Sequence, residues 1–303
     1  MPTIAILGPG GVGGFLAGAL ARAGQGVVIV ARELTAELIA RDGLTLRSVR
    51  LGDFSARPRA VPALREPVDS LIVATKATGL ETALERIEAA PRLVVPLLNG
   101  LDHMAVLRER FGHTVAAGTI RIEADRPTPG RIVQTSPFLR IDLAADDPRL
   151  REPVELLAET LERAGVPVRL GPSEAQILWT KLVRLNALAC TTSASDKPVG
   201  FIRSDPGWRA ELTACISEAA AVANADGARI DPADPLAELD DAHAELGSSM
   251  QRDIAAGREP ELDAIPGSVL RAAARHGLEC PTIARLAAEV ARRAKVPAPS
   301  RLN

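Results

Sequence analysis

The sequence predicts an α/β protein in which an N-terminal, doubly wound parallel sheet is followed by a C-terminal domain made of helices alone. Short apolar runs alternate with helical patterns in the first half of the chain, as they do where helices wrap a parallel sheet. From residue 174 onward the pattern is helical almost throughout, with Ala-, Leu- and Arg-rich stretches interrupted by prolines. We therefore expect a first domain of residues 1–171 and a second of residues 172–303.

The elements of the first domain can be placed in order. The four apolar runs that predict parallel strands are residues 3–7, 27–30, 70–74 and 93–98. Helical patterns fill two of the intervals, at residues 14–24 and 80–87. Further strands are expected at residues 115–122, 131–134, 138–143 and 166–170, with a helix at residues 150–164.

The turn after the first strand carries the pattern Gly-x-Gly-x-x-Gly. In such turns the first glycine permits the tight bend, the second lets the backbone approach a pyrophosphate, and the third allows close helix–strand packing. A Gly-rich turn alone could be merely structural, but here it sits between a strand and a helix, the context that a dinucleotide site requires. The sequence therefore predicts a Rossmann-type domain with a cofactor on Gly8, Pro9, Gly10, Gly11, Val12 and Gly13.

Residues at the ends of the next strands indicate the type of cofactor. An acid after the second strand binds the ribose hydroxyl of NAD, whereas an arginine accommodates the 2′-phosphate of NADP. Arg32 stands there, with Glu33 as a competitor, so NADP is favoured. Lys76 after the third strand could meet phosphate or lie on the surface. Asn99 after the fourth could reach a cofactor ribose or form a plain Asn-Gly turn.

Lysine is scarce in this chain. Of 36 basic residues only Lys76, Lys181, Lys197 and Lys295 are lysines. Lysine can give up its proton, which arginine cannot, so proton transfer is one reason to keep it. Lys181 shares the apolar stripe of its helix with Ile177, Leu185 and Leu188. Burial there would suit it to general acid catalysis, although its stem could also lie along the stripe with its amine in water.

Further on, Ser248 and Ser249 fall in a helix, and Glu261 begins the next one. A carboxylate in a first helical turn ordinarily complements the helix dipole, so Glu261 alone indicates little.

Taken together, these motifs resemble the 2-dehydropantoate 2-reductases, or ketopantoate reductases, over roughly residues 3 to 290. The blocks that carry the resemblance are the Gly8–Gly13 turn, Arg32, Lys76, Asn99-Gly100, Trp179-x-Lys181-Leu182, Ser248-Ser249-Met250-x-x-Asp253-Ile254 and Glu261-x-Asp263-x-Ile265-x-Gly267.

The resemblance implies NADPH as hydride donor and a keto-acid substrate held in an interdomain cleft, as in the pantoate-forming step of pantothenate biosynthesis. It implies that Lys181 is the general acid and that Ser249 holds the substrate. Glu261 would hydrogen-bond substrate or nicotinamide ribose, and Asn99 would contact the nicotinamide end. Arg32 and Lys76 would hold the 2′-phosphate, and the helical domains would pair into a homodimer.

This sequence departs from the family pattern beside the lysine. Pantoate-forming members carry asparagines four and eight residues after it, where this chain has Leu185 and Ala189. An apolar wall therefore replaces two amide groups on the Lys181 face, which favours a more apolar keto acid as an alternative substrate. Arg184 could supply a replacement carboxylate anchor, and Thr192 returns to the lysine face. Pro260 stands where the family usually has a hydroxyl residue.

Composition excludes other classes of function. The formal net charge is −2, and with five Phe, two Trp and no Tyr we expect no nucleic-acid partner. We expect no membrane segment and no signal peptide, because charged residues interrupt the apolar runs and the chain begins directly with a strand pattern. Three widely spaced cysteines suit a cytoplasmic protein without a metal site. An NADP-binding regulatory protein without turnover is the alternative from another class.

Overall fold

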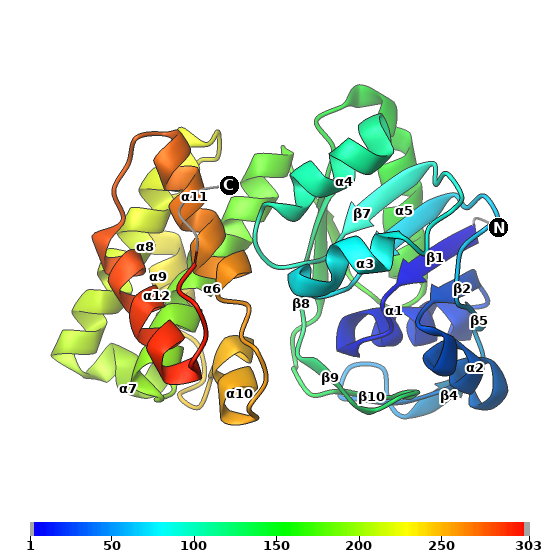
Figure 1. The fold of residues 1–303 in the computed structure, drawn as a ribbon, viewed down its shortest axis with the longest axis horizontal. Coiled ribbons are helices and arrows are strands. Elements are labelled where there is room, and N and C mark those ends of the chain that lie inside the picture. The colour runs from blue at the N-terminus through cyan, green and yellow to red at the C-terminus, as the bar shows by residue number, and fades with distance from the viewer. Residues whose placement is uncertain (1–2, 300–303) are drawn as a thin grey trace. The chain divides into compact units, whose positions relative to one another are not determined.

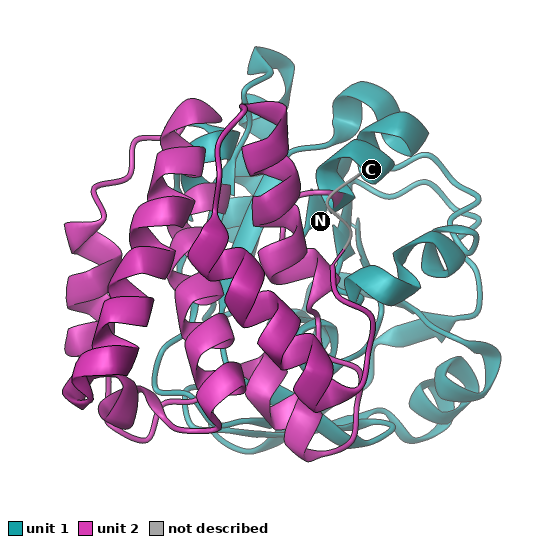
Figure 2. Cartoon of the chain, turned by 60° about the vertical axis from the view of Figure 1, so that its left-hand side comes forward, with its two compact units in different colours: residues 1–98, 103–177 teal, residues 99–102, 178–303 magenta. Residues whose placement is uncertain are grey.

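The computed structural model describes residues 3–299, and the chain divides into two compact units (Figure 2). Unit 1 consists of Met1–Leu98 with His103–Ile177, and unit 2 of Asn99–Asp102 with Leu178–Asn303. The short segment Asn99–Asp102 thus groups with the helices, although a division at residue 171 assigns it to the first domain.

Unit 1 is built on a five-stranded sheet with the order β5-β2-β1-β6-β7, of which β1, β2, β5 and β7 are labelled in Figure 1. The strands are β1 (Thr3–Leu7), β2 (Gly26–Val30), β5 (Arg59–Val61), β6 (Ser70–Val73) and β7 (Leu93–Pro96). Every neighbouring pair runs parallel, which confirms the predicted parallel sheet. Most of these strand residues are buried, as expected where helices cover both faces.

A helix follows each of the strands β1, β2, β6 and β7 along the chain. These helices are α1 (Gly11–Arg22), α2 (Glu33–Asp42), α3 (Leu80–Leu84) and α4 (His103–Phe111). Helix α1 packs its buried side chains Phe15, Leu16 and Leu20 into the apolar core of unit 1. Helix α3 is shorter than the predicted 80–87, because Ile87 leaves the helix to form an isolated bridge with Leu64.

Two smaller sheets complete unit 1. One has the order β4-β3-β10-β9 and consists of β3 (Leu44–Ser48), β4 (Phe54–Ala56), β9 (Ala124–Thr128) and β10 (Arg131–Gln134). The other has the order β12-β11-β8 and consists of β8 (Ala117–Arg121), β11 (Arg140–Ala144) and β12 (Val168–Leu170), covered by α5 (Arg151–Arg163). Strands β3, β4, β5 and β9 were not anticipated from the sequence, whereas β8, β10, β11 and β12 fall inside or close to the predicted runs.

Unit 2 is helical. Helix α6 (Glu174–Ser195) leads into it and ends where Asp196 takes a left-handed φ of 60°, two residues before Pro198. The remaining helices are α7 (Val199–Ser204), α8 (Pro206–Ala225), α9 (Ala233–Asp240), α10 (Ser249–Ala255), the π-helical turn η4 (Asp263–Gly267), α11 (Ser268–Arg275) and α12 (Pro281–Ala294). Helix α8 lies at the centre, in contact with α7, α9, α11 and α12.

The described helices include none with the length and apolar character needed to cross a membrane. Among residues 3–299, no group of three or more His, Cys, Asp or Glu side chains is arranged to hold a metal ion.

Candidate active site

The glycine turn after β1 is formed as the dinucleotide motif requires. Gly8 has a φ of 92°, and a Cβ there would lie 2.8 Å from Thr75 Cγ2. A Cβ on Gly13 would lie 2.2 Å from the carbonyl oxygen of Gly8, so the start of α1 packs directly on the turn. Both positions therefore exclude any side chain.

Gly10 is different, because a Cβ at this position would meet no atom within 4 Å. It precedes α1, whose first turn carries no acidic side chain and whose N-cap makes no side-chain hydrogen bond. The first turn of α1 therefore supplies no carboxylate of its own to compete with an anionic group for the amide groups at the helix start. The turn fits the pyrophosphate of a dinucleotide.

Two cations lie on either side of this turn. Leu7, at the end of β1, pairs with Val30 of β2 and with Val73 of β6. Arg32 and Lys76 follow these two partners by two and three residues, and both side chains are exposed. Because β1 lies between β2 and β6, the glycine turn, Arg32 and Lys76 share the carboxyl edge of the sheet, where ligands of such folds bind.

In unit 2, Lys181 lies in the third turn of α6 and is partly buried. Trp179 and Leu182, close to it in sequence, are 1% and 2% exposed. Leu185, one turn later, is partly buried, whereas Ala189 is fully buried. The apolar packing of the helix therefore covers the Lys181 side chain only in part.

Asn99 and Glu261 are brought together within unit 2. Asn99 Nδ2 donates a hydrogen bond to Glu261 Oε2 across 2.8 Å. The next residue, Gly100, has a φ of 84°, and a Cβ there would lie 2.0 Å from the carbonyl oxygen of Ala264 in η4. Glu261 thus lies just before a π-helical turn, an irregularity that is common at functional sites.

A buried arginine secures this arrangement. Arg271 donates from Nη2 to Asp102 Oδ2 (2.7 Å) and from Nη1 to Asp263 Oδ1 (2.8 Å), with only 6% of its side chain exposed. It therefore ties the segment that begins at Asn99 to the turn that follows Glu261. Neither Asp102 nor Arg271 was given a role from the sequence, because one buried arginine cannot be recognised in a chain whose cations are nearly all arginine.

Ser249 is the first residue of α10 and is partly buried. The helix is capped by Ser248, whose Oγ accepts a hydrogen bond from the backbone N–H of Gln251. Thr192 of α6 is fully buried, and its hydroxyl contacts the Leu188 carbonyl (2.6 Å) and Ser248 Oγ (2.9 Å). The structure thus joins Thr192 to the residue beside Ser249.

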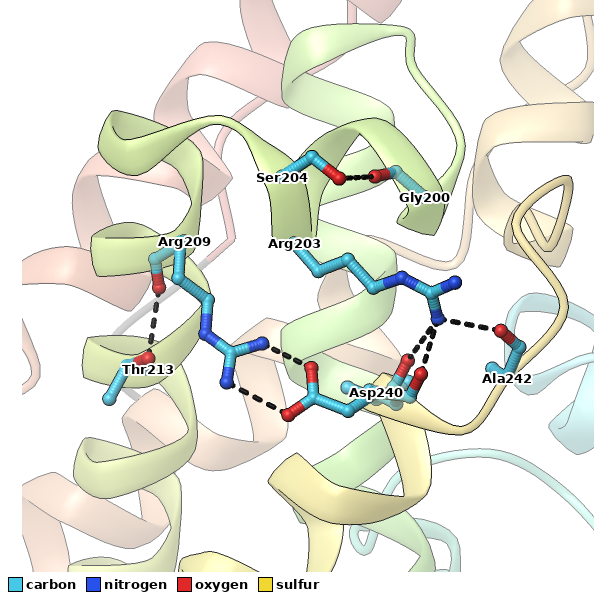
Figure 3. Close-up of polar contacts among 8 residues, drawn as sticks. Gly200, Arg203, Ser204, Arg209, Thr213, Asp240 and Ala242 are labelled. Atoms are coloured by element: carbon cyan, nitrogen blue, oxygen red, sulfur yellow. Dashed lines mark hydrogen bonds and ion pairs between the residues drawn. The ribbon is translucent and has the colours of Figure 1, made fainter.

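Arg184 forms an ion pair with Glu238 of α9, with 3.2 Å between Nε and Oε2. Helix α9 is further fixed at its end, as Figure 3 shows: Arg203 donates to the carbonyl oxygens of Asp240 and Ala242, and Arg209 pairs with the Asp240 carboxylate. The Arg184 charge is therefore used at least in part to hold α9.

This fold, with an open glycine turn in one unit and the Lys181, Ser249, Asn99 and Glu261 side chains in the other, is that of a two-unit oxidoreductase. The model of the family "Ketopantoate reductase PanE/ApbA" matches residues 4–145, and that of "Ketopantoate reductase PanE/ApbA C terminal" matches residues 175–295. The 2-dehydropantoate 2-reductase of Caulobacter vibrioides is 30% identical over 95% of this chain and 98% of its own. The chain belongs to the ketopantoate reductase family.

Solved structures agree in fold. The 2-dehydropantoate 2-reductase of Geobacter metallireducens superposes with a TM-score of 0.87 at 28% identity, covering 96% of this chain and 99% of that one. A D-mandelate dehydrogenase, solved with NADH and anilino(oxo)acetate, has a TM-score of 0.86 at 20% identity, covering 97% of this chain and 98% of its own. The likeness to the second protein shows the shared fold.

Proposed function

We propose that this protein reduces a 2-keto acid to the 2-hydroxy acid with NADPH, and that 2-dehydropantoate is its foremost candidate substrate. The observation that carries the proposal is the hydrogen bond between Asn99 and Glu261. It joins two side chains that the family resemblance assigns to the nicotinamide and substrate end of the site.

The cofactor, when bound, supplies the hydride that adds to the carbonyl carbon. Lys181 donates a proton to the carbonyl oxygen as negative charge develops there. A lysine serves and an arginine does not, because only the lysine can release its proton. Ser249 binds the substrate from the first residue of a capped helix, where its side chain is partly buried.

Glu261 orients Asn99 and contacts the substrate or the nicotinamide ribose. Its carboxylate accepts the Asn99 N–H, so the amide is held in one direction. The glycine turn supports the pyrophosphate, and Arg32 and Lys76 bind the 2′-phosphate at the edge they share. Arg184 and Thr192 remain candidates for substrate contact, Thr192 through Ser248.

An apolar keto acid is the second candidate substrate. Leu185 and Ala189 offer no hydrogen bond at the two positions where pantoate-forming members carry asparagines. A site that hydrogen-bonds a substrate hydroxyl discriminates strongly in favour of substrates that carry it. The absence of the two asparagine side chains therefore favours a substrate without that hydroxyl. A homodimer and a cytoplasmic location remain predictions from the resemblance and the composition.

The decisive experiment follows NADPH oxidation with 2-dehydropantoate, pyruvate, 2-ketoisovalerate and 2-ketoisocaproate, in wild type and Lys181→Ala. We expect one keto acid to be preferred by about 100-fold, near 3 kcal/mol in the transition state, and Lys181→Ala to lose most of that activity. A preference for 2-ketoisocaproate would select the apolar alternative. NADPH binding without turnover of any keto acid would favour the alternative function, an NADP-binding regulatory protein. Full activity of Lys181→Ala would mean that Lys181 is not the general acid.

A further inference from the structure

An ion pair beside the glycine turn joins Glu33 to Arg86. Arg86 donates from Nη1 to Glu33 Oε1 (2.9 Å) and from Nη2 to Oε2 (3.3 Å). The same Nη1 also donates to the carbonyl oxygen of Pro62 (3.0 Å). The guanidinium therefore engages both carboxylate oxygens at once while it is fixed to the main chain of a third segment.

The pair lies at the carboxyl edge of the parallel sheet. Glu33 is the first residue of α2 and follows Arg32 directly. Pro62 follows β5, the strand that pairs with β2. Arg86 follows α3, and its own carbonyl oxygen accepts a hydrogen bond from the backbone N–H of Leu64 (2.8 Å), so its main chain is held in place. Arg86 is also the more buried partner, with 23% of its side chain exposed against 64% for Glu33.

The position of Glu33 creates a conflict for an NADP site. An acid at the end of the second strand binds the ribose hydroxyls of NAD and repels a 2′-phosphate. Glutamate is an anion at neutral pH, and the hydrogen bond from Arg86 holds the pKa of Glu33 further below its usual value. An unpaired Glu33 carboxylate would thus stand next to Arg32 and oppose the phosphate that Arg32 is suited to bind.

We propose that Arg86 is a specificity-determining residue for the cofactor: by occupying both oxygens of Glu33 it prevents this carboxylate from binding a ribose hydroxyl and lets the neighbouring Arg32 bind a 2′-phosphate. The proposal rests on the proposed function for its cofactor. Because 64% of the Glu33 side chain is exposed, water can solvate its carboxylate once Arg86 is replaced, so we expect the variant to fold.

The test is a titration of NADPH and of NADH against wild type, Arg86→Met, Glu33→Gln and the double variant, with dissociation constants measured by calorimetry in the absence of keto acid. Arg86→Met should bind NADPH about tenfold more weakly and NADH as well or better, because the released carboxylate repels phosphate and accepts ribose hydroxyls. The double variant should regain NADPH affinity to within about twofold of Glu33→Gln, since no acid remains to be neutralised.

A matched control is Arg59→Met, which breaks the two-pronged pair between Arg59 of β5 and Glu66 and changes the net charge by the same amount. We expect its NADPH and NADH constants to stay within about twofold of wild type, because exposed pairs elsewhere act weakly.

Three results would overturn the proposal. Equal weakening of NADPH and NADH in Arg86→Met would show a merely structural role. Failure of Glu33→Gln to restore the double variant would show that Arg86 itself contacts the phosphate. A wild type that binds neither nucleotide, or prefers NADH, would remove the selectivity to be explained. The titration contains no keto acid. Dissociation constants that change as expected would therefore support the role of Arg86 even if the protein did not reduce a keto acid.

Discussion

Asn99 and Glu261 are 162 positions apart in the chain, yet Asn99 Nδ2 lies 2.8 Å from Glu261 Oε2 and donates a hydrogen bond to it. Asn99 follows β7 by three residues, whereas Glu261 lies two residues before the first residue of the π-helical turn η4. The two side chains thus form a hydrogen-bonded pair in the candidate site, although they come from distant segments of the chain.

The first prediction concerns this pair. Asn99→Ala and Glu261→Ala should each lower kcat/KM for the preferred keto acid by about 10- to 100-fold, since each leaves the other without its partner. The double variant should be little worse than the poorer single variant, with a coupling of about 1–3 kcal/mol. Steady-state kinetics on the four proteins measures this. Glu259→Ala, exposed and two residues before Glu261, is the control. Strictly additive losses would mean that the two residues act separately.

The sequence predicted the parallel sheet because buried parallel strands are short, nearly continuous apolar runs, and the strand–glycine–helix order is visible locally. It did not reveal β3, β4 and β9, because β4 has only three residues, β9 is almost wholly exposed, and β3 alternates buried and exposed residues instead of forming a continuous apolar run. Glu33 was weighed only as a ribose ligand, because its partner Arg86 lies 53 positions away.

The sequence could predict single residues of the candidate site but not the contacts between them. Lys181 stood out because lysine is rare here and this one lies on an apolar stripe. Thr192 was placed on the lysine face by helical spacing alone, but spacing does not show that its hydroxyl is bonded to Ser248 and to the main chain. The contacts of Arg271 depend on three segments meeting, which no local pattern encodes.

The second prediction concerns Arg271. Arg271→Met should lower the free energy of unfolding by about 3 kcal/mol, because it removes the cation shared by Asp102 and Asp263 from a buried position. Arg209→Met breaks the more exposed pair with Asp240 in the same unit and should cost about 0–1 kcal/mol. Urea unfolding followed by circular dichroism compares the two. Equal losses would show that burial of Arg271 adds nothing.

The third prediction concerns pH and Glu174 in unit 1. Burial raises the pKa of Glu174 above its usual value of 4.5, and the ion pair with Arg108 offsets this only in part. A carboxyl whose pKa is higher in the folded state binds more protons folded than unfolded, so its contribution to stability falls as pH rises from 4.5 through the raised pKa.

Glu174→Gln resembles the protonated acid and removes this dependence. The melting temperature of the variant relative to wild type should therefore increase as pH rises through that window, which scanning calorimetry at several pH values can follow. Glu159→Gln, on the exposed face of α5, should leave the profile unchanged. If the melting temperature of Glu174→Gln instead fell relative to wild type as pH rises, the ion pair with Arg108 would outweigh desolvation in setting the pKa of Glu174.

The last prediction separates the two roles of the glycine turn. Gly10 has an ordinary φ of −73° and open space where a Cβ would lie, so Gly10→Ala should melt within about 2 °C of wild type. Its methyl group would nevertheless occupy the room proposed for the pyrophosphate, and NADPH should bind at least about tenfold more weakly. Gly13→Ala places its Cβ 2.2 Å from the Gly8 carbonyl oxygen, so it should cost about 1–3 kcal/mol of stability before any nucleotide is added. Melting curves and calorimetric titration with NADPH measure both effects, and undiminished NADPH binding by Gly10→Ala would mean that the pyrophosphate does not lie over this residue.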